Sequence, residues 1–136
     1  GLAVALDIDV EALMEARRRD PSLALVIGDL THLPFRSESL DLTWNSSTLE
    51  HLGEPLIALE EMARVTRTGG MLFVGVPYLC GPLGFQRWIQ RTTVGIWIGT
   101  TFDLRQLKQL FLQAHTTPQH HIFYFFRFFI GLLARK

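Results

Sequence analysis

Two aspartates that follow short apolar runs are the residues best placed to do chemistry in this chain. Asp7 ends the run 2–6, and Asp29 follows the run 25–28. Neither run alternates polar and apolar residues, so both are predicted to be parallel strands covered on both faces. Ligands bind at the carboxyl ends of such strands. We therefore expect Asp7 to accept hydrogen bonds from a ribose diol, and Asp29 to accept one from an exocyclic amine such as that of adenine.

Composition narrows the class of protein. The 136 residues suit a single domain, placed here at 1–136. Lys plus Arg and Asp plus Glu number 13 each, without a long basic run, which argues against nucleic acid and favours small-molecule chemistry. The longest apolar stretch, 122–133, contains Arg127 and is too short for stable membrane insertion. The lone Cys80 and the lack of an opening signal peptide predict a reducing cytoplasm and a buried, inert thiol.

Apolar periodicity predicts alternating helices and strands around the two acids. An acid at a strand end can also cap the next helix, and this is the role predicted for Asp9. In a second helix, Glu60 and Arg64 are predicted to form an i,i+4 pair, and residues 68–70 to reverse the chain. Helices are expected at 10–19, 55–66 and 102–114, and strands at 23–28, 40–45, 71–77, 121–125 and 128–134. The last two strands should form an antiparallel pair at the edge of the sheet.

Residues 78–100 interrupt this alternation. Glycines and a proline are interleaved there with phenylalanine and tryptophan. Because the segment follows the carboxyl end of a strand, we predict an insertion over the site, part helix and part loop. Its aromatic residues either line a pocket or only cover the sheet.

The order of these elements, with the two acids and several short strings, resembles the class I S-adenosylmethionine-dependent methyltransferases, and their small-molecule branch in particular. The strings are Leu33-Pro34-Phe35, Glu50-His51-Leu52, Glu60-Glu61-Met62-Ala63-Arg64-Val65 and Gly69-Gly70. The resemblance implies a Rossmann-like α/β fold with a mostly parallel sheet and a C-terminal antiparallel strand pair. It also implies S-adenosylmethionine as the cofactor and methyl transfer to a small molecule. The acceptor itself is not indicated.

The resemblance also assigns residues to the cofactor. In the family, the acid that ends the second strand binds the ribose hydroxyls, which corresponds to Asp7, and Ile8 would pack against the adenine. The aspartate after the third strand contacts the adenine amine, which corresponds to Asp29, and the backbone N–H of Leu30 would meet a ring nitrogen.

Two further polar residues follow the run 40–45. Asn45 ends that run, where it could contact the cofactor or the acceptor. His51 is the candidate for a general base, which is needed only if the acceptor must lose a proton. His51 could equally be a packing or capping residue at the start of the next helix. The spacing of the other histidines resembles no closed metal site, so no metal is predicted.

One part of the family pattern is absent. The family's first strand and its Gly-x-Gly-x-Gly loop would stand before Gly1, so we expect a fragment truncated at the N-terminus, with impaired methyl transfer. The gap deprives segments 2–6 and 40–45 of their partner strand. Either these two segments pair with each other, which we expect, or a neighbouring chain fills the gap and the protein self-associates.

Two rival functions can be stated. Short-chain dehydrogenases share the acidic pair, but they need a lysine four residues after a tyrosine, and Tyr78 and Tyr124 are followed at that distance by Pro82 and Phe128. The stronger rival is a non-catalytic remnant of the fold that acts as a binding or interaction module. The missing glycine-rich loop favours it.

Overall fold

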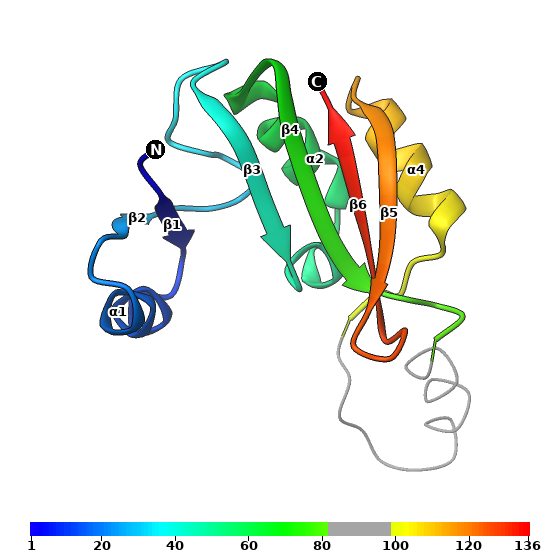
Figure 1. Cartoon of the computed structure of the whole chain (residues 1–136), viewed down its shortest axis with the longest axis horizontal. Coiled ribbons are helices and arrows are strands. Elements are labelled where there is room, and N and C mark those ends of the chain that lie inside the picture. Colours follow the sequence, from blue (N-terminus) through cyan, green and yellow to red (C-terminus); the bar gives the residue numbers. More distant parts are fainter. Residues whose placement is uncertain (82–98) are drawn as a thin grey trace.

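A computed structural model describes residues 1–81 and 99–136 of the chain (Figure 1). The helices are α1 (Val10–Arg19), the 3-10 helix η1 (Leu49–His51), α2 (Pro55–Val65) and α4 (Leu104–Gln113). The strands are β1 (Val4–Asp7), β2 (Ala24–Ile27), β3 (Leu40–Ser46), β4 (Thr66–Pro77), β5 (Thr117–Tyr124) and β6 (Phe129–Arg135). Most of the predicted insertion lies outside the described residues. Every other predicted helix and strand is present.

The first unit is a parallel strand pair with a helical connection. β1 pairs with β2 from Val4 opposite Ala24 onward. The carboxylate of Asp9 accepts a hydrogen bond from the backbone N–H of Glu11 at 2.8 Å, so the predicted helix cap is confirmed. Both strands are only half-buried, and the prediction that they are covered on both faces is wrong. The physical reason is that α1 covers a single face of a sheet of only two strands.

The second unit is a four-stranded sheet in the order β3-β4-β6-β5. β3 and β4 are parallel, whereas β6 is antiparallel to both β4 and β5, which confirms the predicted C-terminal pair at the sheet edge. α2 and α4 lie behind this sheet in Figure 1. No helix of the described residues is long and apolar enough to cross a membrane. The buried core lies between these layers and includes Leu59, Met62, Leu72, Val74, Leu107, Phe111, Ile130 and Leu132.

β4 begins earlier than the sequence predicts. It starts at Thr66, directly after α2, instead of at residue 71. The chain does bend where a reversal at residues 68–70 is predicted, but the bend lies within β4: Thr66 pairs with Leu40 and Met71 with Leu42, so the residues between them bulge out of the ladder. Gly69 has a φ of 80°, a left-handed conformation that glycine adopts without steric cost, and the register between β3 and β4 shifts beside it.

The two units remain separate sheets. No pairing joins β1 to β3 in the described structure, so the predicted closure between segments 2–6 and 40–45 is wrong. A cavity of about 140 Å³ lies between them, lined by Leu6 from β1 and Trp44 from β3. The loop from β2 to β3 contributes Leu30, Leu33 and Phe35 to its walls. The space between β1 and β3 is therefore a cavity lined by side chains, and the two strands do not meet.

Cys80 lies on the surface. It follows the end of β4 by three residues, in a turn beyond the sheet, and its side chain is exposed. The prediction of a buried thiol is therefore wrong. Composition alone favours burial of cysteine, but it does not show that the sheet has already ended at Pro77.

Candidate functional site

The carboxyl ends of β1, β3 and β4 point to the same side of the molecule, the lower side in Figure 1. A cavity of about 110 Å³ lies there. It is lined by Leu6, Asp7, Ile8, Gly28, Asp29, Leu30, Asn45, Thr48 and Leu52. All five residues that the sequence assigns to the cofactor are among them, although they come from three separate segments of the chain.

Asp7 and Asp29 both line this cavity, and each carboxylate also accepts a hydrogen bond from the residue two positions later in the chain. Oδ1 of Asp7 accepts a hydrogen bond from the backbone N–H of Asp9 at 2.9 Å. Oδ1 of Asp29 accepts two from Thr31, one from its backbone N–H and one from its hydroxyl, both at 2.8 Å. These two bonds lower the pKa of Asp29, so this carboxylate is ionised at neutral pH. These bonds use one oxygen of each acid, which leaves the other as an acceptor.

Asn45 and Leu30 present further polar groups to the cavity. Oδ1 of Asn45 is buried and has no hydrogen-bond partner among the described residues. The backbone N–H of Leu30 likewise donates no hydrogen bond within this part of the chain. Buried polar atoms without partners are rare in proteins. Together with Ile8, which is 73% exposed and offers an apolar surface, they fit a ligand with hydrogen-bond donors, an acceptor and a flat ring.

Sequence reasoning missed four lining residues. Leu6, Thr48 and Leu52 carry no chemical signal, and Thr48 and Leu52 lie in an irregular segment without periodicity. Gly28 could have been found, because it stands at a strand end directly before Asp29. A Cβ atom there would lie 3.0 Å from Leu6 Cδ1 and 3.3 Å from Pro34 Cδ, so a larger residue would push these side chains away from the wall of the cavity.

His51 does not line this cavity. It ends η1, and its side chain is 49% exposed. Its Nε2 atom lies 3.9 Å from Oε1 of Glu50, which is beyond hydrogen-bond distance. The described residues also contain no group of three or more potential metal ligands.

Glu50 is a further residue that the sequence alone did not single out. Its relative exposure is 2%, and neither carboxylate oxygen has a hydrogen-bond partner within residues 1–81 and 99–136. Burial raises the pKa of this carboxyl group, and nearby His51 opposes the shift. No pattern in the sequence indicates that this particular acid points inward.

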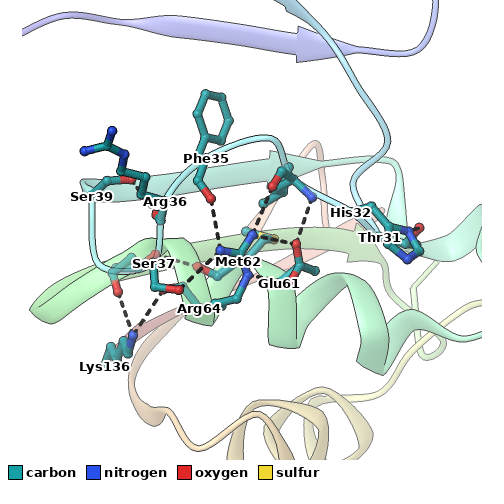
Figure 2. Close-up of polar contacts among 12 residues, drawn as sticks. Thr31, His32, Phe35, Arg36, Ser37, Ser39, Glu61, Met62, Arg64 and Lys136 are labelled. Atoms are coloured by element: carbon teal, nitrogen blue, oxygen red, sulfur yellow. Dashed lines mark hydrogen bonds and ion pairs between the residues drawn. The ribbon is translucent and has the colours of Figure 1, made fainter.

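A clamp of two charged residues from α2 fixes the loop that follows the cavity (Figure 2). Arg64 donates hydrogen bonds to the backbone oxygens of Leu33 and Phe35, both at 2.9 Å. Glu61 accepts from the backbone N–H of Leu33 at 2.8 Å and from Arg64 at 2.6 Å. The hydrogen bond from Arg64 is the main cause that lowers the pKa of Glu61. The clamp therefore holds the chain immediately after Leu30.

This clamp corrects the predicted ion pair. Arg64 pairs with Glu61 at i,i+3, so the predicted i,i+4 partner Glu60 is wrong. Both spacings are possible on a helix. Here the loop decides between them, because Glu61 and Arg64 can both reach its backbone from the same side of α2.

The fold and the cavity define a Rossmann-like α/β protein with a ligand site at the carboxyl ends of its parallel strands. Residues 1–74 match the family described as a methyltransferase domain, and because this is more than half of the chain, the chain belongs to that family. By lineage it is an S-adenosylmethionine-dependent methyltransferase, and S-adenosylmethionine is the cofactor of that lineage.

Similar proteins agree with this assignment. The demethylmenaquinone methyltransferase of Paenarthrobacter aurescens is 42% identical over 71 residues, which are 52% of this chain and 28% of that protein. The chain thus matches less than a third of that relative. Magnesium protoporphyrin IX methyltransferase from Synechocystis PCC 6803, solved with bound SAH, has a TM-score of 0.84 at 14% identity, over 100% of this chain and 64% of that one. An S-adenosylmethionine-dependent methyltransferase from Methanosarcina mazei has a TM-score of 0.80 at 15% identity, over 98% of this chain and 81% of that one. The predicted fold class is confirmed.

Proposed function

We propose that this chain binds S-adenosylmethionine in the cavity at the carboxyl ends of β1 and β3 and serves methyl transfer to a small molecule. Asp7 accepts the ribose hydroxyls, Ile8 packs on the adenine, Asp29 accepts its amine and the N–H of Leu30 donates to a ring nitrogen. Asn45 contacts the ligand through its unpaired oxygen. The observation that carries the proposal is that Asp7 and Asp29 line one cavity beside the partnerless Oδ1 of Asn45.

The cofactor supplies the activated methyl group, so the chain's own contribution is mainly to bind and orient. Asp7 and Asp29 fix the two ends of the nucleoside, and the clamp of Glu61 and Arg64 keeps the second of these contacts in place. If the acceptor must lose a proton, His51 is the base we propose, because η1, which it ends, follows the carboxyl end of β3.

A small molecule is the proposed acceptor. The name of the Paenarthrobacter relative states that its substrate is demethylmenaquinone, which is a small molecule and not a macromolecule. The equal numbers of acidic and basic residues support the same conclusion, because nucleic-acid binding relies on excess positive charge.

Isothermal titration calorimetry with S-adenosylhomocysteine tests cofactor binding directly. The wild-type chain is expected to bind, and Asp29→Ala to weaken binding about 10-fold or more, as expected for a lost hydrogen bond to a charged group. Asp20→Ala is a matched control. Oδ1 of Asp20 accepts the same two kinds of hydrogen bond, here from Ser22, but Asp20 lies away from the cavity.

Equal weakening by Asp29→Ala and Asp20→Ala would show that the loss of a turn, and not of a ligand contact, explains the effect. Absence of any heat with the wild-type chain would count against cofactor binding by this chain. That result would favour the rival, a non-catalytic module.

We also propose that the chain self-associates through its unpaired strand edges. β3 is an edge strand of its sheet, and β1 faces it across a cavity of about 140 Å³ without pairing. Sedimentation equilibrium is expected to show dimers at micromolar concentration, and Leu42→Lys, which places a charge at a half-exposed position of β3, to shift the population toward monomer. A monomer at all concentrations would contradict this role.

A further inference from the structure

The carboxylate of Asp29, which lines the cavity, stands at the end of a short chain of hydrogen bonds. Its Oδ1 atom accepts from the backbone N–H and from the hydroxyl of Thr31, both at 2.8 Å. The same hydroxyl oxygen lies 3.0 Å from Nδ1 of His32. Figure 2 shows Thr31 and His32 together on the loop that follows β2. An imidazole, a hydroxyl and a carboxylate are thus linked beside the cavity.

The direction of these hydrogen bonds follows because Asp29 is ionised at neutral pH. A carboxylate has no hydrogen to give, so the single hydroxyl hydrogen of Thr31 must point at Oδ1 of Asp29. Oγ1 of Thr31 can then meet Nδ1 of His32 only as an acceptor. This assignment puts a hydrogen on Nδ1 in either protonation state of the imidazole. The chain therefore runs one way, from His32 through Thr31 to Asp29, and hydrogen bonds in such a chain polarise one another.

Asp20 provides a comparison within the same protein. Its Oδ1 atom accepts from the backbone N–H of Ser22 at 2.9 Å and from the hydroxyl of Ser22 at 2.6 Å. These bonds close a turn ahead of β2, and no ligand is needed to explain them. At Asp29 two features are added, because the carboxylate lines the cavity and an imidazole contacts the hydroxyl that binds it. A turn alone requires neither feature.

The chain of hydrogen bonds also decides which oxygen of Asp29 remains for a ligand. With Oδ1 held by two donors, the carboxyl group cannot rotate without breaking both bonds. Oδ2 is then the acceptor that is left, and it keeps one orientation before any ligand arrives. Ordering a binding group in advance lowers the entropic cost of binding.

We propose that Thr31 and His32 are positioning residues that act through Asp29 and make the site select adenine by its exocyclic amine. The proposal rests on the proposed function, in which that amine donates a hydrogen bond to Asp29. Hypoxanthine has a carbonyl oxygen in place of the amine, so it would present a second acceptor to the carboxylate and leave it unpaired. Sites built to bind a donor reject ligands that lack it for this reason.

The test compares S-adenosylhomocysteine with its hypoxanthine analogue, S-inosylhomocysteine, by calorimetry at pH 8. Wild type is expected to prefer the adenine ligand. Thr31→Val keeps the shape of the side chain and the backbone N–H but removes the hydroxyl. It should reduce the preference about 3-fold or more, the effect of one hydrogen bond of modest net strength. Thr31→Ser restores a hydroxyl and should restore the preference. Ser22→Ala removes the hydroxyl of the comparable turn at Asp20 and should leave the preference unchanged.

Two variants of His32 examine the other end of the chain. Asparagine can place an amide N–H near the position of Nδ1, whereas leucine has no donor. His32→Leu should therefore reduce the preference for adenine, by about 2-fold, and His32→Asn should retain it. The double variant Thr31→Val/His32→Leu should lose no more preference than Thr31→Val alone, because the imidazole acts through the hydroxyl. Losses that add in the double variant would contradict this chain.

The remaining outcomes separate this proposal from the function beneath it. If Thr31→Val weakens both ligands equally, or changes neither, the hydroxyl serves only the turn and the proposal is overturned. A wild type that binds S-adenosylhomocysteine without preferring it to the analogue also overturns the proposal, while cofactor binding itself stands. If wild type binds neither ligand, both the proposal and the proposed function are overturned for this chain.

Discussion

Replacing Gly75 by alanine is expected to destabilise the four-stranded sheet by about 1–3 kcal/mol, the usual cost of an overpacked interior. A Cβ atom at this position would overlap the hydroxyl of Tyr124 and lie 3.1 Å from Oγ of Ser46. Tyr124 would have to move, and its 3.1 Å hydrogen bond to Ser46 would be lost. Urea denaturation monitored by circular dichroism measures the change in the free energy of unfolding.

A double-mutant cycle tests whether the overlap with the Tyr124 hydroxyl causes the loss of stability in Gly75→Ala. Tyr124→Phe alone removes the hydroxyl and should cost about 0.5–1.5 kcal/mol through the lost hydrogen bond. The double variant Gly75→Ala/Tyr124→Phe should lose less stability than the two single variants lose together. The reason is that Tyr124→Phe removes the hydroxyl with which the new Cβ atom would overlap. Strict additivity would contradict the explanation and would place the cost of Gly75→Ala in the backbone of β4.

Local signals determined how much of the fold could be predicted. α1 begins and ends where the sequence predicts, because Asp9 caps its first turn and Asp20-Pro21 stops it. The strand pair at the C-terminus was predictable because a run of aromatic and β-branched residues leaves room for only a short turn. Each of these elements is specified by residues within a few positions of it.

The errors concern contacts between distant segments. The partner of Arg64 depends on where the loop after β2 passes over α2, and helix spacing alone allows either Glu60 or Glu61. The separation of β1 from β3 likewise involves the same loop, because its side chains, such as Phe35, line the cavity between the strands. Neither arrangement leaves a trace in a single stretch of sequence.

In the candidate site, too, residues with a local sequence signal could be predicted and residues placed by distant contacts could not. Asp7 and Asp29 could be assigned in advance, because each stands at the end of an apolar run and strand ends converge on one edge of a parallel sheet. Glu50 could not, because its burial follows from the packing of η1 against α2 and β4, elements that lie later in the sequence. Its adjacent, half-exposed neighbour His51 was the more conspicuous residue by type, yet it does not line the cavity.

Replacing Glu50 by glutamine is expected to make the protein more stable at pH 8, and this gain should disappear in acid. Burial raises the pKa of Glu50 in the folded state above its unfolded value, so the folded protein binds this proton more tightly than the unfolded chain does. The stability that depends on the proton is fully present below the unfolded pKa. It is lost as the pH rises through the folded pKa, and Glu50→Gln has no such loss.

The difference in unfolding free energy between Glu50→Gln and wild type should therefore be near zero at about pH 4 and reach about 1–3 kcal/mol by pH 8, the usual cost of a buried polar group without partners. Chemical denaturation at several pH values measures it. Glu54→Gln, at an exposed position, should differ from wild type by a constant amount across the same range. A Glu50→Gln variant that is less stable than wild type at pH 8 would reveal a stabilising partner for this carboxylate.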